Sequence, residues 1–215
     1  MTGMPSTLAM LALLVAGTSV AGETSAATGI WNFRVLLDGQ PIGVHRFSVS
    51  TEGDLRTLVS EADFAVKFLG ITVYRYRHQA TEQWRGDCLG ALSSTTDDDG
   101  KLSRVRSARE GDAYRITTAT TALSVPGCVM SYAYWNPAIR AQTRLLNAQT
   151  GEIDTVRIAR VGSGTVEVGG QPIAATRFRV SAEARAVDVW YSAQGDWVGL
   201  DATVGGGRTL SYRLP

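Results

Sequence analysis

Alternation of apolar and polar side chains is the main pattern of the chain from residue 30 onward. It is strictest over residues 71–84, where Tyr74, Tyr76 and His78 fall on one face and the residues between them fall on the other. A period of two residues is typical of a β-strand that buries one face. The pattern predicts strands over residues 30–37, 41–50, 55–68, 71–84, 102–109, 113–121, 152–161, 165–168, 172–182, 186–192, 197–204 and 209–214.

Turn signals rich in glycine and aspartate separate these predicted strands. The Asp-Gly pair at 38–39 lies between two alternating segments and is a strong signal for a tight hairpin. The acidic run over 97–99 is interpreted as a solvated turn, because a calcium loop needs acidic residues at alternate positions. The Gly-Ser-Gly sequence over 162–164 is interpreted as a further hairpin turn.

Residues 130–151 are the place where the strand pattern stops. Asn136 is a good helix N-cap, and Pro137 fits the first helical position. Gly151 could end the segment. The side chains at helical spacing are Ile139, Thr143 and Leu146. We expect a short helix or a helical turn that lies on the sheet.

A repeated motif raises the question of internal duplication. The segments 39–50 and 170–181 both begin with Gly-Gln-Pro-Ile and continue with Arg-Phe and then Val-Ser at the same spacing. Either the domain has two related halves joined near 130–151, or the same turn chemistry arose twice. The expected fold is all-β: a strongly curved antiparallel sheet or incomplete β-barrel with one short helical segment, forming a single domain over 27–215.

The first 26 residues are expected to be a signal peptide. An apolar run over 8–15 is followed by small residues, with cleavage expected after Ala21 or Ala26. The alternative is a buried N-terminal helix. No later run approaches the length of a spanning helix, so we do not expect an integral membrane protein. A secretory signal would place the mature chain in the periplasm or outside the cell.

Two cysteines, Cys88 and Cys128, lie in the part that would be mature. In an oxidising compartment an even pair is most simply a disulfide, which here would link a strand end to the turn before the helical segment. The alternative is two buried free thiols.

Composition and residue spacing argue against several functions. The formal net charge of +1 provides no field that would attract nucleic acid. The two histidines, His45 and His78, lie far apart in the sequence on separate predicted strands, so no zinc site or other cofactor site is expected. No serine stands on a strand–turn–helix elbow, and no catalytic residues are assigned. We therefore expect a protein that is not an enzyme.

Several segments resemble one family of bacterial proteins. They are Val-Tyr-Arg-Tyr over 73–76, Glu-Gln-Trp over 82–84, Tyr-Trp-Asn-Pro over 134–137, Leu-Leu-Asn-Ala-Gln-Thr-Gly over 145–151, Trp-Tyr-Ser over 190–192, Trp-Val-Gly-Leu over 197–200 and Gly-Arg-Thr-Leu-Ser-Tyr-Arg-Leu over 207–214. The family is DUF6134, and similarity to the DUF3108 group of exported β-proteins is looser. The resemblance implies an exported, mostly β protein of undefined role, and it carries over no site residues.

Two classes of function remain after these exclusions. The first is a binding module whose concave face holds a hydrophobic or amphipathic ligand such as a lipid. Aromatic side chains would contact the apolar part, and arginines would meet an anionic head group. The expected ligand-binding residues are Tyr74, Tyr76, Trp84, Tyr134, Trp135, Arg140 and Arg144. The second class is a structural or interaction protein of the cell envelope, with a filled core and a protein partner.

Overall fold

The computed structural model describes residues 29–183 and 185–215 of the chain. The N-terminal strands are β1 (Gly29–Leu37), β2 (Gln40–Glu52), β3 (Leu55–Phe68), β4 (Ile71–Arg85), β5 (Cys88–Asp98), β6 (Lys101–Glu110), β7 (Ala113–Thr117) and β8 (Ala122–Pro126). The later strands are β9 (Arg144–Leu146), β10 (Ile153–Thr155), β11 (Arg157–Val168), β12 (Gln171–Ala182), β13 (Arg185–Ser192), β14 (Trp197–Val204) and β15 (Arg208–Arg213). The expected signal peptide over 1–26 lies outside the described residues.

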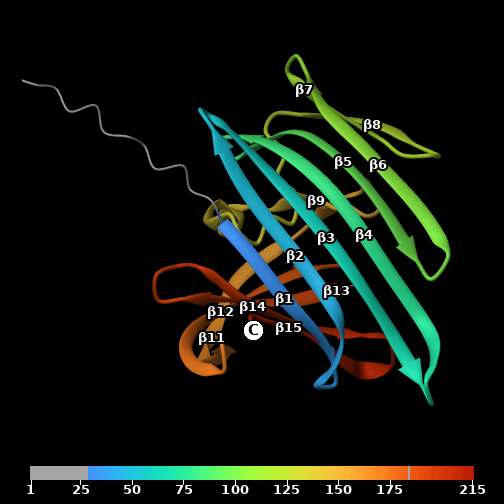
Figure 1. The fold of residues 1–215 in the computed structure, drawn as a ribbon. Coiled ribbons are helices and arrows are strands. Elements are labelled where there is room, and N and C mark those ends of the chain that lie inside the picture. Colours follow the sequence, from blue (N-terminus) through green and yellow to red (C-terminus); the bar gives the residue numbers. More distant parts are fainter. Residues whose placement is uncertain (1–28, 184) are drawn as a thin grey trace, which may run out of the picture.

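Thirteen of these strands form one antiparallel sheet that stays open. Its order is β11-β12-β13-β14-β15-β1-β2-β3-β4-β5-β6-β7-β8, so nearly every neighbour is the next strand in the chain. The exception is the central pair, in which β1 and β15 come from opposite ends of the described chain. Figure 1 shows the blue to green strands arching over the orange to red strands, which run across them. The strong curvature and the open edges confirm the predicted fold class.

Alternation decides which side chains enter the core. In β4, every second residue from Tyr76 to Trp84 is buried and the residues that alternate with them are exposed, as the two-residue period predicts. The largest fully buried side chains come from the N-terminal strands and from residues 127–156: Trp84, Tyr114, Phe33, Leu89, Ile116, Met130, Ile139, Leu145 and Leu146. Each such burial stabilises the fold by about 1.5–3 kcal/mol before the loss of conformational entropy.

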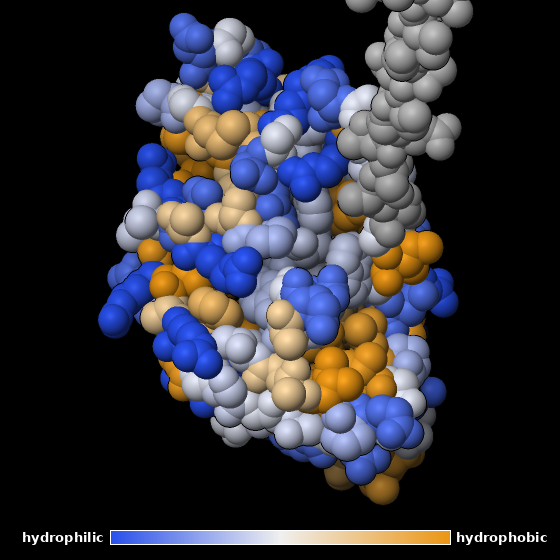
Figure 2. Space-filling view, turned by 90° about the vertical axis from the view of Figure 1, so that its left-hand side faces the viewer, coloured by the Kyte–Doolittle hydropathy of each residue, from blue (hydrophilic) through white to orange (hydrophobic). Residues whose placement is uncertain are grey.

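Apolar side chains also lie on the surface, at one end of the molecule. Phe68, Leu69 and Ile71 at the β3–β4 turn are 67%, 87% and 69% exposed. That turn is at the lower end in Figure 1, and the lower part of the face seen in Figure 2 is likewise the more apolar part. The upper part of that face carries mostly charged and polar residues.

The hairpin at residues 38–39 has the predicted geometry. Asp38 and Gly39 both have positive φ, at 51° and 79°, which is the conformation that a tight hairpin turn needs. The Asp38 carboxylate also accepts hydrogen bonds from Arg208 Nε at 2.7 Å and from the Thr209 backbone N–H at 2.8 Å. The β1–β2 turn is thereby bound to β15, the last strand of the chain.

Residues 127–156 connect the two open edges of the sheet, from β8 to β11, and this connecting segment lies against the core. It contains the 3-10 turn η1 (Pro137–Ala141) and the small β9–β10 sheet. Its start is tied to β5 by a disulfide between Cys88 and Cys128, with a Cα–Cα distance of 5.2 Å. The disulfide prediction is therefore confirmed, and the pair stands at the point where the chain leaves the sheet.

The helical prediction for the connecting segment is correct in place but too long. Asn136 caps η1 as expected, since its side chain accepts a hydrogen bond from the Ala138 backbone N–H at 3.0 Å. The helix ends at Ala141, and Leu146 belongs to strand β9. The helical spacing of apolar residues was misleading, because Leu145 and Leu146 are both buried in an extended conformation.

Two other predictions about turns and strand ends are wrong. The Gly-Ser-Gly sequence at 162–164 is not a hairpin turn, because β11 continues through it with a bulge at Val161. Glycine suits a bulge as well as a turn, which explains the error. Strand β7 ends at Thr117 and not at residue 121, since a tight turn held by Thr118 and Thr121 follows it.

The two copies of the repeated motif occupy comparable positions. Each begins the second strand of a hairpin, β2 in one case and β12 in the other. Within the described ranges, no helix is both long enough and apolar enough to span a bilayer.

Candidate functional site

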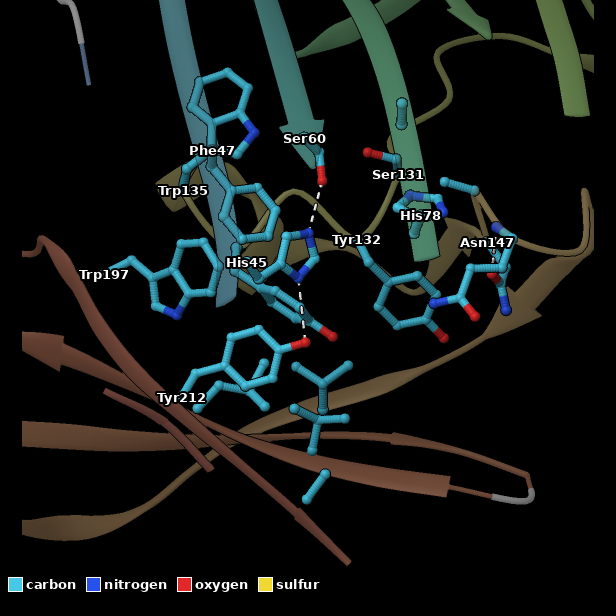
Figure 3. A pocket seen from close by; sticks show the side chains of 18 of the residues that line it. His45, Phe47, Ser60, His78, Ser131, Tyr132, Trp135, Asn147, Trp197 and Tyr212 are labelled. Carbon is cyan, nitrogen blue, oxygen red and sulfur yellow. Dashed lines mark hydrogen bonds between the residues drawn. The ribbon is translucent and has the colours of Figure 1, made fainter. Parts of the chain in front are cut away.

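The concave side of the sheet encloses a cavity of about 250 Å³ that is partly open to solvent. One wall comes from β2, β3 and β4, the facing wall comes from β12 to β15, and the connecting segment closes a third side (Figure 3). The two sheet walls differ in chemistry. The first carries the polar lining residues His45, Ser60, His78 and Glu82. The facing wall is mainly aliphatic, although it also carries Arg185, Trp197 and Tyr212. Its aliphatic residues are Val180, Ala182, Val187, Leu200, Ala202 and Leu210.

His45 is held from both sides of its ring. Its Nε2 lies 2.8 Å from Ser60 Oγ, and its Nδ1 lies 3.2 Å from the Tyr212 hydroxyl. Burial lowers the pKa of His45 to about 3, with a smaller contribution from repulsion by His78, so the ring is neutral at pH 7. In a neutral ring one nitrogen donates and the other accepts, and the two hydroxyls can satisfy both.

His78 and Glu82 lie on the inward face of β4, with Ala80 between them. His78 Nδ1 is hydrogen-bonded to Thr96 Oγ1 at 2.8 Å, and burial lowers its pKa to about 4. Its ring centroid is 6.4 Å from that of His45, so the two histidines that are far apart in the sequence are neighbours in the fold. They lie on separate strands, β2 and β4, as predicted, and two rings alone do not form a metal site.

Glu82 is the most unusual member of the polar wall. It is 4% exposed, and its Oε2 accepts hydrogen bonds from Trp84 Nε1 at 2.9 Å and from Ser131 Oγ at 3.1 Å. Burial raises the pKa of Glu82 to about 7, and the two hydrogen bonds oppose this shift only in part. Its charge state therefore changes near neutral pH.

Aromatic side chains complete the lining. Phe47, Tyr134 and Trp197 come together from β2, the connecting segment and β14, with ring centroids 5.0 Å apart for Phe47–Trp197 and 5.6 Å apart for Tyr134–Trp197. Tyr132 and Trp135 also face the cavity. Burial raises the pKa of Tyr134 above its usual range, so this phenol stays neutral.

The exposed members of the lining, Gln149 and Arg185, mark the mouth of the cavity. Arg185 is paired there with Asp154, at 2.5 Å from Nη2 to Oδ2. The same carboxylate accepts a hydrogen bond from the Tyr132 hydroxyl at 2.6 Å. The positive charge at the mouth is therefore already neutralised by a protein group.

The chain is similar to a known protein family. A family model described as a domain of unknown function, DUF6134, matches residues 33–215. The chain belongs to the DUF6134 family. A comparison with curated proteins finds none that matches this chain.

The fold of this DUF6134 protein is similar to a solved structure. That structure is the crystal structure of a β-barrel-like protein of the domain of unknown function DUF1849, from Brucella abortus. The TM-score is 0.62 at 10% sequence identity, and the match covers 87% of this chain and 95% of that chain. At this identity the likeness shows a shared fold and carries no residue roles.

Two of the seven residues expected to bind a ligand lie at the cavity, and a third packs beside them. Tyr134 and Trp135 line it directly. Trp84 lies behind them, with its ring centroid 5.6 Å from that of Trp135 in an edge-to-face arrangement. Trp84 does not line the cavity itself, but it donates a hydrogen bond to Glu82, which does.

The other expected residues of the DUF6134 protein lie elsewhere. Tyr76 stacks on Phe64 in the core at 4.7 Å, and the Tyr74 hydroxyl donates to Asp98 at 2.7 Å. The Arg140 guanidinium lies over the rings of Phe178 and Tyr191, at 5.6 and 5.4 Å from their centroids. Arg144 is exposed on β9. These four residues do not line the cavity.

The polar lining residues of β2 to β4 were not predicted from the sequence. The alternation that puts Tyr76, His78 and Trp84 on the inward face of β4 also puts Glu82 there, and an acidic residue at a core position is a signal worth following. Ser60 pairs with His45 much as a nucleophile pairs with a base, but Tyr212 occupies the position at which a triad has a carboxylate. Within the described ranges, no three His, Cys, Asp or Glu side chains cluster as metal ligands would.

Proposed function

We propose that this DUF6134 protein is a non-enzymatic binding module that acts outside the cytoplasm and holds a small amphipathic molecule in its cavity. The observation that carries the proposal is the two-sided lining, in which four polar residues of β2 to β4 face six aliphatic residues of β12 to β15. A molecule with one apolar side and one hydrogen-bonding end would satisfy both walls. A binding pocket of mostly apolar character with a few placed polar groups is typical of small-molecule sites.

The volume limits the ligand. At about 250 Å³ the cavity falls just below the range of roughly 300–1,000 Å³ that encloses drug-sized molecules. It therefore suits a short-chain amphipath, or one end of a longer molecule that leaves through the mouth at Gln149 and Arg185. A complete two-chain lipid would not fit inside.

Action outside the cytoplasm is supported by the disulfide, because such bonds persist in oxidising compartments. The expected signal peptide over 1–26 points the same way. Fractionation of cells that express the full-length chain, with N-terminal sequencing of the product, tests this part. Cleavage after residue 21 or 26 is the expected result, and an uncleaved cytoplasmic product would contradict it.

The binding test uses a variant in which larger side chains fill part of the cavity. Ala182 and Ala202 both line its aliphatic wall, so Ala182→Leu combined with Ala202→Leu should occupy part of the space. Titration calorimetry with 1-octanol should show saturable one-to-one binding to the natural protein and a loss of at least about tenfold in affinity for the filled variant.

The matched control for this test is Ala186→Leu. Ala186 is exposed on β13, next to the inward-facing Val187, so the same enlargement there leaves the cavity unchanged. Equal affinity of the natural protein and this control is expected. Binding of 1-octanol that survives in the filled variant would contradict the assignment of the site.

A second candidate function is that of an interaction protein of the cell envelope. It is supported by the exposed apolar turn between β3 and β4, with Phe68, Leu69 and Ile71. Exposed apolar patches often mark contacts with a protein partner. Leu69→Asp combined with Ile71→Asp should abolish co-purification of a specific envelope protein if this function is correct, and it should leave 1-octanol binding intact.

A further inference from the structure

Glu82 is a buried carboxyl group with unused hydrogen-bonding capacity at the cavity. Both hydrogen bonds that it accepts from described residues go to Oε2, from Trp84 and Ser131, so Oε1 has no partner among them. None of the ion pairs within the described ranges includes Glu82. A buried carboxylate without a cation is costly, and a ligand that supplies positive charge would remove that cost.

The protein does not supply this cation itself. Among the described lining residues, Arg185 alone carries a permanent positive charge. It is held at the mouth by Asp154, and its guanidinium carbon lies 5.9 Å from the centroid of the Tyr132 ring. His45 and His78 are both neutral at pH 7, because burial lowers the pKa of each ring.

The remaining surroundings suit a positively charged group. The faces of aromatic rings attract cations, most strongly when water is excluded. The rings that line the cavity belong to Phe47, Tyr132, Tyr134, Trp135, Trp197 and Tyr212. Neutral histidines add no repulsion, and no described lysine lies in the lining.

We propose that Glu82 binds the ammonium group of a small amphipathic amine, whose aliphatic part lies against Val180, Val187 and Leu200. This inference rests on the proposed function and names its ligand class. It assigns the cavity to a cation with an apolar body and disfavours a fatty acid, whose carboxylate would face Glu82 without an available cation. Oε1 of Glu82 is the acceptor for the ammonium N–H.

The pH dependence follows from the charge state of Glu82. An alkylamine with a pKa of about 10.4 stays protonated between pH 6 and 8, whereas Glu82 ionises near pH 7. Amine affinity should therefore rise from pH 6 to pH 8. The other titratable or charged groups around the cavity or coupled to Glu82 are His45, His78, Tyr114, Tyr132, Tyr134, Asp154, Arg185 and Tyr212. Between pH 6 and 8 the tyrosines and both histidines stay neutral, and Arg185 stays positively charged.

Titration calorimetry at pH 8 with octylamine, 1-octanol and octanoate tests the inference, since the three probes share one chain and differ in the head group. Octylamine should bind about tenfold tighter than 1-octanol, the factor expected for one hydrogen bond to a charged group. Octanoate should bind most weakly. Glu82→Gln should remove the amine preference, so that octylamine and 1-octanol bind this variant with affinities within about threefold of each other.

Glu61→Gln is the matched control, because Glu61 is exposed on β3 and its loss changes the net charge equally. It should keep the amine preference. Octanoate binding as well as octylamine, or an amine preference unchanged in Glu82→Gln, would overturn this inference alone. Failure of all three probes to bind would overturn the proposed function together with it.

Discussion

Val35 in the first strand and Tyr212 in the last strand are direct neighbours in the antiparallel sheet, and both are buried. This pairing joins the N-terminal strands that carry the polar wall to the C-terminal strands that carry the aliphatic wall. It also brings the Tyr212 hydroxyl to within 3.2 Å of His45 Nδ1. The β1–β15 pairing, which joins the two halves of the sheet, thus also contributes to the wall of the cavity.

Tyr212 should therefore contribute strongly to stability. Tyr212→Ala removes a ring packed against Phe33, with centroids 5.8 Å apart, and should lower the free energy of unfolding by about 3–5 kcal/mol. Tyr212→Phe removes only the hydroxyl and should cost about 1 kcal/mol. Urea unfolding of both variants checks this. A loss below 1 kcal/mol for Tyr212→Ala would show that Tyr212 contributes little to the pairing of β1 with β15.

The disulfide should stabilise the connecting segment. Cys88 and Cys128 lie 40 positions apart, and cross-linking a loop of this length stabilises by about 4 kcal/mol in the chain-entropy model. The double variant Cys88→Ser and Cys128→Ser should lose about that much in urea unfolding under non-reducing conditions. The control is the natural protein with reductant, which should lose a similar amount. Equal stability with and without reductant would contradict the role given to the bond.

His78 should make the protein sensitive to acid. Its pKa is lowered to about 4 in the folded state against an ordinary value of 6.5, so below pH 6.5 the unfolded state binds a proton that the folded state does not. Stability therefore falls as the pH falls from about 6.5 toward 4. His78→Asn should remove about 2–3 kcal/mol of the stability lost between pH 7 and pH 4.5. An unchanged pH profile in this variant would contradict a buried neutral ring.

Glu82 should have the opposite dependence. Its pKa is raised to about 7 in the folded state from 4.5, so the folded state binds the extra proton, and stability is lost as the pH rises from about 4.5 to 7. Relative to Glu82→Gln, the natural protein should lose on the order of 3 kcal/mol between pH 4 and pH 8. Thermal or urea unfolding across this range measures the difference. A constant difference between the two proteins would mean that Glu82 is not buried in a low-dielectric site.

Much of the fold could be predicted from local pattern. Alternation in β4 and the Asp-Gly pair at 38–39 determine strand faces and a hairpin without any knowledge of distant contacts. The connecting segment could be located by its broken pattern and its Asn136 cap. Its extended course beyond Ala141 could not, because Leu145 and Leu146 are extended by pairing and packing that the local sequence does not reveal.

Less of the candidate site could be predicted from local sequence pattern. Tyr134 and Trp135 could be proposed as lining residues because aromatic residues gather near the break in pattern. The contact between His45 and His78 depends on the register of β2, β3 and β4, which a single strand pattern does not fix. Glu82 was visible as an inward acidic residue, but its significance depends on the closure of the cavity by Ser131 and the facing wall.

Native mass spectrometry of the mature protein, produced in its own host and purified without detergent, tests the central claim most directly. The account predicts a bound small molecule with one equivalent per chain, released on denaturation and absent from the variant with Ala182→Leu and Ala202→Leu. After denaturation and removal of that molecule, the refolded protein should take up one equivalent of added octylamine. A bare protein mass that octylamine does not change, or a bound molecule retained equally by the filled variant, would contradict a ligand site in this cavity.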